Sequence, residues 1–327
     1  MKKIISILSL FIFCLIASSC GAITGDFKYN FTYLNSDMFL FGNATIENTS
    51  DLNKLHLRWY DGNITIQTHD QDSIIIEETI VPNLQTVDND RKVHYYYNDG
   101  TLLLEYGKSG IKNYENISKD VVITIPQNNN YDIGITSYSA DVTLSMSNYE
   151  NQLNELTIST TCGAVYCNID RANIVQIAGY SYDSDEKDNR NFVFNGNYVN
   201  KLSFNSSYAE VQVNVKEVGS FNNVGSVFEK TIINVDKIKH VELEINRAES
   251  FITIIEFDSM DLKFRDEKAY LYLPTDIGFT IKADINKVQV NFDNVKLDSD
   301  NNEYVVLNGE KSISIYTENM VYVNQIN

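Results

Sequence analysis

The sequence predicts an all-β protein folded as a β-solenoid, a parallel β-helix with coils of about 20–23 residues and a β-rich N-terminal cap. Three observations predict this fold. Apolar and polar residues alternate along most of the chain, with almost no helical periodicity. The inventory of 21 tyrosines and 16 phenylalanines against 3 prolines is typical of strands. A short motif with a small first residue also recurs along the chain, as it does in solenoids.

Composition limits the functional classes before any motif is considered. The 327 residues include 26 Lys and Arg against 44 Asp and Glu, a formal net charge of −18. Nucleic acid is therefore not expected as a partner, because phosphate binding relies on clustered basic side chains. A content of 43% hydrophobic and 21% charged residues is that of a globular chain. We expect residues 44–327 to form a single solenoid domain.

The first twenty residues resemble a bacterial lipoprotein signal. Lys2 and Lys3 precede an uncharged, apolar-biased stretch over 4–17, which as a helix is about 21 Å long and too short to span a bilayer. Small residues then lead to Cys20, as in a lipobox. We expect residues 1–19 to be removed and Cys20 to carry the lipid, with residues 20–43 forming the lipidated N-terminus and a short tether. An ordinary signal peptide cut near residue 17 or 19 is the alternative.

This signal predicts an extracytoplasmic protein held by its lipid on a membrane of the bacterial cell envelope. No later apolar run reaches the length of a membrane span. The choice between inner and outer membrane stays open.

The N-terminal part, 44–126, is expected to consist of strands joined by tight turns. Residues 55–59 alternate strictly, and after a turn at Asp61-Gly62 residues 63–68 alternate again. A second turn at Asp99-Gly100 separates two more such runs. The remaining expected strands lie at 73–79, 92–97 and 101–106.

The main coils, 127–274, carry the internal repeat. A small residue stands before an alternating run at five expected corners, namely Ala140, Gly163, Ala209, Gly225 and Ala248. Their sequence numbers differ in turn by 23, 46, 16 and 23, so the coil period is expected near 23. The interval of 46 is twice that period and contains one further coil, with the polar stretch 181–191 extruded from its corner. Residues 275–327 form the C-terminal coils.

The repeat predicts which side chains fill the core. Stacked coils bury a continuous apolar column, and a small corner residue lets neighbouring coils approach closely. The side chains that follow three of the corners are expected to point inward: Val142, Leu144, Met146, Val165, Cys167, Ile169, Val211, Val213 and Val215. An antiparallel sandwich of alternating strands is the alternative fold.

Two cysteines remain in the folded body, because Cys14 lies in the signal and Cys20 is lipidated. Cys162 and Cys167 are spaced unlike a zinc knuckle, and no second pair completes four ligands. Either they are two buried or half-buried thiols, or a tight corner joins them in a disulfide.

From about residue 46 onward the sequence resembles a bacterial putative-adhesin family of unknown function. The resemblance rests on Leu57-Arg58-Trp59, the run 62–66, Ile74–Glu78, Asp99–Leu102, Val122–Pro126, the corner Ser139–Val142, Leu271–Pro274 followed by Gly278–Ile281, and the last strand Ser312–Thr317. It implies an exported, non-enzymatic β-solenoid that acts as an adhesin-like binding or structural module. It implies no catalytic residue.

Candidate metal and cofactor sites are weak. His56, His69, His94 and His240 stand at no metal-ligand spacing, and no phosphate loop, dinucleotide fingerprint or nucleophile elbow is present. Two acidic turns resemble calcium loops, through Asp183 and Asp185 and through Asp298 and Asp300, although each lacks a required residue. Solvated turns are the favoured interpretation, and no cofactor is expected.

A polysaccharide-active enzyme is the main alternative function, and an envelope-stress or assembly factor is the other. Asp141, Glu210 and Glu249 would share one corner column, with the last two about 9.6 Å apart across two coils. Inverting glycosidases separate their carboxyl groups by about 6.5–9.5 Å. The expected column is interrupted by Ala164 and Ser226, which favours a non-enzymatic protein.

Tyrosine is in excess at positions expected near corners or on outward faces: Tyr95, Tyr96, Tyr97, Tyr138, Tyr166, Tyr180, Tyr182 and Tyr208. Such side chains suit a protein or neutral glycan partner. Cross-strand aromatic pairing within the sheet is the alternative.

Overall fold

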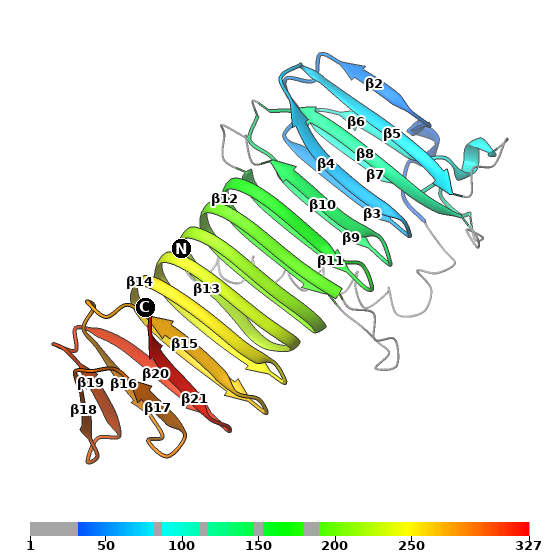
Figure 1. Ribbon diagram of the computed structural model, residues 1–327. Helices are drawn as coiled ribbons and strands as arrows, with labels where there is room; N and C mark the ends of the chain where they lie inside the picture. Colours follow the sequence, from blue (N-terminus) through cyan, green and yellow to red (C-terminus); the bar gives the residue numbers. More distant parts are fainter. Residues whose placement is uncertain are drawn as a thin grey trace, which may run out of the picture.

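The computed structural model describes residues 32–81, 87–111, 117–127, 129–146, 153–179 and 190–326, and in these ranges the protein is all-β (Figure 1). Their regular elements are strands and two short 3-10 turns, η1 (Ser36–Met38) and η2 (Asn89–Arg91). No helix in the described ranges is long and apolar enough to cross a membrane. The expected signal peptide and Cys20 lie outside these ranges.

The N-terminal part mixes parallel and antiparallel pairs. Its strands are β1 (Leu40–Phe41), β2 (Ala44–Glu47), β3 (Lys54–Trp59), β4 (Asn63–His69), β5 (Ser73–Val81), β6 (His94–Asn98), β7 (Thr101–Glu105), β8 (Ser118–Pro126) and β9 (Asp132–Ser137). β6 and β7 form an antiparallel hairpin, and β5 lies antiparallel between β2 and β8. β3 is parallel to both β7 and β9. The predicted turns at Gly62 and Gly100 both have positive φ, which glycine adopts without strain.

The middle of the chain is a stack of parallel strands, seen side by side in Figure 1. It contains β10 (Asp141–Met146), β11 (Leu153–Thr160), β12 (Val165–Gly179), β13 (Arg190–Asn246), β14 (Glu249–Arg265) and β15 (Ala269–Leu273). Val142 pairs with Val165, and Val165 pairs with Phe192, at sequence offsets of 23 and 27. Further on, Lys230 pairs with Glu249 and Ser250 with Ala269, both at a sequence offset of 19. The spacing of neighbouring strands therefore changes along the chain.

The C-terminal part continues the parallel pairing and adds antiparallel hairpins. Its strands are β16 (Phe279–Ala283), β17 (Val288–Asn291), β18 (Val295–Asp298), β19 (Glu303–Val306), β20 (Lys311–Thr317) and β21 (Val321–Gln325). β14 pairs with β20 and β15 with β21, both in parallel. β19 pairs antiparallel with β16 and β18.

One apolar core runs through the described strands, and the predicted inward side chains belong to it. All nine are at most 4% exposed, from Val142 in β10 to Val215 in β13. Because side chains alternate across a strand, burying one set turns the set between them outward. Cys167 belongs to this core, and no disulfide joins it to Cys162.

Candidate functional site

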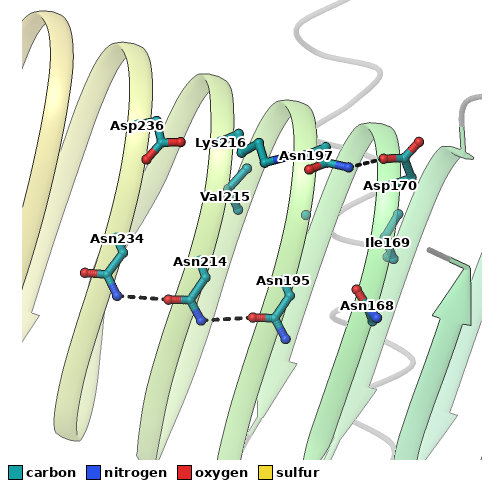
Figure 2. Close-up of a pocket in the computed structure, with 11 residues that line it drawn as sticks. Asn168, Ile169, Asp170, Asn195, Asn197, Asn214, Val215, Lys216, Asn234 and Asp236 are labelled. Atoms are coloured by element: carbon teal, nitrogen blue, oxygen red, sulfur yellow. Dashed lines mark hydrogen bonds between the residues drawn. The ribbon is translucent and has the colours of Figure 1, made fainter. Parts of the chain in front are cut away.

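Three asparagines of β13 form a hydrogen-bonded column on the outside of the parallel stack, which we call the amide ladder (Figure 2). Nδ2 of Asn214 donates to Oδ1 of Asn195, and Nδ2 of Asn234 donates to Oδ1 of Asn214, each at 2.9 Å. Asn168 of β12 stands in register with Asn195 and continues the column. The three bonded amides therefore share one orientation along the stack.

A second outward row lies two residues further along each strand and forms the other wall of a groove. It consists of Asp170, Asn197, Lys216 and Asp236, and Nδ2 of Asn197 donates to Oδ1 of Asp170. We call the space between this row and the amide ladder the amide groove, which has a volume of about 320 Å³. Its lining holds both uncharged amides and charges of both signs.

Gly196 occupies an inward position of β13 beneath the amide groove. It stands in register with Ile169, between the outward side chains of Asn195 and Asn197. A Cβ at this position would lie 3.1 Å from the carbonyl oxygen of Ile169, which is tighter than an ordinary contact. The same Cβ would lie 3.2 Å from Cε1 of the buried Phe194, so glycine relieves crowding against the core beneath the groove.

The local sequence explains the amide ladder. Each asparagine stands between two core positions, as Asn214 does between the buried Val213 and Val215. The strand alternation then places each amide outside. The same order, apolar–Asn–X–polar, begins at Cys167, Phe194, Val213 and Ile233. This recurring order marks the ladder in the sequence. The small corner residues do not reveal it, because the asparagines stand at other positions of the strands.

The amides retain hydrogen-bonding capacity for a ligand. A side-chain amide has two N–H donors and a carbonyl with two lone pairs. Within the ladder Asn214 uses one donor and one acceptor position. Its other N–H and lone pair can face solvent, so the groove presents donors and acceptors that are already oriented. Hydroxyl groups, which both donate and accept, are the complementary ligand chemistry.

A second hollow of about 540 Å³ lies on the N-terminal side of the stack, over β3, β7, β9 and β11. Its lining includes His56, Gly134, Glu105 and Arg58. A Cβ on Gly134 would lie 2.7 Å from Nδ1 of His56, so glycine makes room for the imidazole. Desolvation lowers the pKa of His56, and the Lys54 ammonium lowers it further. Arg58 and Glu105 form an ion pair at 2.7 Å in this hollow, whose lining also carries the charged side chains of Lys54, Asp132 and Glu155.

The structure places the five expected corners in different settings. Ala140 and Gly163 are buried just before β10 and β12, at equivalent positions of paired strands. Ala209 is buried inside β13, and Ala248 lies between β13 and β14. Gly225 lies within β13, five residues before Lys230, which pairs with Glu249. The register partner of Ala248 is therefore not Gly225.

The long interval between Gly163 and Ala209 contains one extra strand passage, which begins at Arg190. Since Val165 pairs with Phe192, the position of Gly163 is taken by Arg190 in the next strand. Arg190 is buried, and its Nη1 donates to the carbonyl oxygen of Thr161 at 2.7 Å. A large side chain directed at the backbone thus stands where the repeat predicts a small one.

The weak calcium candidates remain without support. Asp183 and Asp185 lie outside the described residues. Oδ1 of Asp298 accepts hydrogen bonds from the backbone N–H groups of Asp300 and Asn301, at 3.1 and 3.3 Å. Asp298 therefore caps the turn between β18 and β19, and its hydrogen bonds with Asn301 and Asp300 lower its pKa. In the described ranges no group of three or more His, Cys, Asp or Glu side chains could hold a metal ion.

A basic side chain lies between two of the three carboxylates that were the candidates for catalysis. Lys230 pairs with Glu249 and, with Glu210, lines a small groove beside Tyr166. A lysine therefore lies in the strand passage between the two glutamates. Asp141 is at the start of β10, where Oδ1 accepts from the backbone N–H of Ala164 at 2.8 Å.

Several of the aromatic side chains stack on one another. Tyr60 and Tyr138 are parallel with ring centroids 5.4 Å apart, and Tyr270 stacks on both Phe251 and Tyr322. Stacked rings cover each other's faces, which is the cross-strand role that was the alternative to partner binding. Tyr166, by contrast, is exposed at 40%. The expected surface residues Tyr180 and Tyr182 lie outside the described ranges.

Comparison with known proteins identifies structural neighbours only. No protein-family model and no curated protein matches the chain. A putative adhesin from Parabacteroides merdae is 12% identical with a TM-score of 0.41, covering 88% of this chain and 96% of its own. A putative lipid binding protein from Parabacteroides distasonis is 14% identical with a TM-score of 0.43, covering 88% and 97%. A putative adhesin from Bacteroides fragilis is 11% identical with a TM-score of 0.34, covering 87% and 97%. Proteins named putative adhesins, the class that the sequence motifs resemble, are thus among these neighbours.

Proposed function

We propose that the protein is a lipid-anchored, non-enzymatic binding module of the bacterial cell envelope, and that it binds a neutral glycan in the amide groove. The amide ladder is the observation that carries this proposal. It supplies a row of oriented donors and acceptors, and successive amides are separated by the strand spacing of about 4.8 Å. A chain of hydroxylated units can contact several amides at once.

The fold in this proposal is a β-solenoid. Its support is the parallel pairing of consecutive passages of the chain, at sequence offsets from 19 to 27. An antiparallel sandwich would pair its strands in the opposite direction. Stacked coils also account for a core that continues from β10 to β15.

Charge supports a neutral ligand. The chain carries a formal net charge of −18, and removal of Lys2 and Lys3 with the signal would make it more negative. A surface of that sign repels anionic polysaccharides. We place the ligand in the amide groove rather than on a tyrosine-rich surface, because Tyr60, Tyr138, Tyr270 and Tyr322 stack within the sheet.

An array of neutral and acidic glycans, probed with the purified protein, tests the proposal. Asn214→Leu removes the central amide at similar size and is expected to weaken binding to neutral glycans at least tenfold. Asn205→Leu is the matched control, since it makes the same change in β13 at a position outside the amide groove. Equal binding by both variants, or binding to acidic glycans alone, would contradict the assignment.

The anchor has a separate test. Replacement Cys20→Ala is expected to release the protein from membranes without changing its thermal unfolding. Membrane retention of this variant at the level of the wild type would show that Cys20 carries no lipid.

A further inference from the structure

The first strand of the domain exposes apolar side chains on both of its faces. β1 pairs with β6 through Leu40 opposite Tyr95 and Phe41 opposite His94. Adjacent residues of a strand point to opposite sides, so one of the two normally faces the core. Here Leu40 is 62% exposed and Phe41 is 47% exposed. Both faces of this strand therefore expose an apolar side chain to solvent.

Two residues just before β1 extend the exposed surface. Leu34 is 88% exposed, and Met38, the last residue of η1, is 50% exposed. We call Leu34, Met38, Leu40 and Phe41 the apolar edge. Scattered single apolar residues are normal on a protein surface, whereas exposed apolar side chains gathered in one short segment make that segment a candidate interaction surface.

The apolar edge is held firmly on the domain. The ring of Phe39 packs against Tyr33 and Tyr96, with centroids 4.6 and 5.6 Å apart. Nζ of Lys92 lies 5.9 Å from the centre of the Phe41 ring. Aromatic rings beside a lysine are typical of the boundary between lipid headgroups and acyl chains.

The short stretch of sequence between the apolar edge and Cys20 indicates which surface the edge contacts. Residues 21–33 separate the edge from Cys20, and a fully extended chain of that length reaches about 43–47 Å. A lipid on Cys20 therefore keeps the edge within that distance of a bilayer at all times. The tether converts docking into an intramolecular event at high effective concentration, so a small apolar surface suffices.

We propose that the apolar edge inserts into the interfacial layer of the membrane that holds the Cys20 lipid, an inference that rests on the lipid anchor of the proposed function. The attraction is apolar rather than electrostatic, since the acidic chain is repelled by anionic lipid. The edge lies at the N-terminal end of the stack, opposite the end formed by β16 to β19 (Figure 1). Docking therefore turns the amide groove and the C-terminal strands away from the bilayer.

Tryptophan fluorescence tests the depth of the edge. The only native tryptophan, Trp59, is fully buried and supplies a constant background. The lipidated protein is reconstituted into phosphatidylcholine vesicles whose acyl chains carry bromine, which quenches nearby tryptophan. Leu40→Trp is expected to lose at least twice as much of its fluorescence as the matched control Leu297→Trp, whose leucine is 54% exposed in β18. Phe41→Trp, with Ile255→Trp as its control at 48% exposure, repeats the measurement at a second position.

Flotation of the vesicles separates the two proposals. If the protein floats with the vesicles but Leu40→Trp and Leu297→Trp are quenched equally, docking is overturned and the anchor stands. Protein that does not float overturns the anchor, and docking with it. A third outcome would assign the edge to a second copy of the chain. In that case the tryptophan of Leu40→Trp is not quenched, and the protein forms a dimer that Leu40→Ser dissociates.

Discussion

The ammonium group of Lys119 lies 2.9 Å from Oε1 of Glu78, and both side chains are removed from solvent. The same ammonium donates to the carbonyl oxygens of Arg91, at 3.0 Å, and Tyr106. It also lies 4.1 Å from the centre of the Tyr106 ring. One buried cation thus connects β5 and β8 with the segments that flank β6 and β7.

Breaking this pair is expected to destabilise the protein strongly. Glu78→Gln or Lys119→Met leaves the other partner buried without its counter-charge, which costs about 3–5 kcal/mol. The double variant is expected to cost less than the sum of the two, as measured by urea unfolding. The exposed pair Lys237–Glu256 is the control, because replacing Lys237 by Met changes stability by less than about 1 kcal/mol. Additive losses would show that the two buried groups do not interact.

The carboxyl group of Glu105 predicts a pH dependence. Burial raises its pKa to about 7, although Nε of Arg58 donates to both of its oxygens at 2.8 and 2.9 Å. Between pH 4.5 and 7 the folded state then binds more protons than the unfolded state. The stabilising contribution of this group is full below about pH 4.5 and is lost as pH rises through 7, a change of about 3 kcal/mol. Unfolding free energies measured from pH 4 to 8 should show this slope.

The variant Glu105→Gln isolates that contribution. It is expected to remove the part of the slope that Glu105 supplies, because the amide does not titrate. Glu242→Gln, in half-buried surroundings on β13, should leave the slope in place. A decline of the same size in both variants would contradict the raised pKa of Glu105.

Replacing Gly163 even by alanine is expected to destabilise the protein. A Cβ there would lie 1.8 Å from the carbonyl oxygen of Ala140, a backbone atom that cannot move without shifting the neighbouring strand. Overpacking of this kind costs about 1–3 kcal/mol. The thermal unfolding temperature of Gly163→Ala should fall accordingly, while that of Ala164→Ser, on the half-buried residue beside it, should stay near wild type. Equal unfolding temperatures would show that the strands separate easily at this corner.

The two thiols of the folded body are expected to react at different rates. Burial raises the pKa of Cys167 far above its usual value, whereas Cys162 is partly exposed. A thiolate is the reactive species, so a water-soluble thiol reagent at neutral pH should modify Cys162 first. Cys167 should react only on unfolding. Modification of Cys167 at the native rate of Cys162, measured by peptide mass, would show that the core opens locally.

The sequence predicts the core better than it predicts the outer surface. The inward set from Val142 to Val215 follows from strand alternation alone, and the predicted interval of 23 is the observed offset between Val142 and Val165. The later offsets of 27 and 19 depend on how many residues each passage of the chain takes, which alternation does not specify. This is why Gly225 is not the partner of Ala248, and why Lys230 separates Glu210 from Glu249.

The candidate site leaves a trace in the sequence, the recurring order apolar–Asn–X–polar, but only three-dimensional register shows that these asparagines form one column. The asparagines of the amide ladder stand 19 and 20 residues apart, so no fixed period aligns them before the strands are paired. The burial of Lys119 is equally difficult to predict from the sequence, because this residue stands beside Asp120 in an ordinary polar stretch. Its burial depends on Glu78, which is 41 residues away.

The constant sequence offset of 19 between Lys230 and Glu249, and again between Ser250 and Ala269, has an evolutionary consequence. Neighbours in space are separated by one short interval of sequence, so duplicating or deleting a whole interval leaves every other pairing unchanged. Relatives of this protein can therefore differ in length by multiples of such an interval. Each addition would lengthen the molecule by one strand spacing and move its two ends further apart.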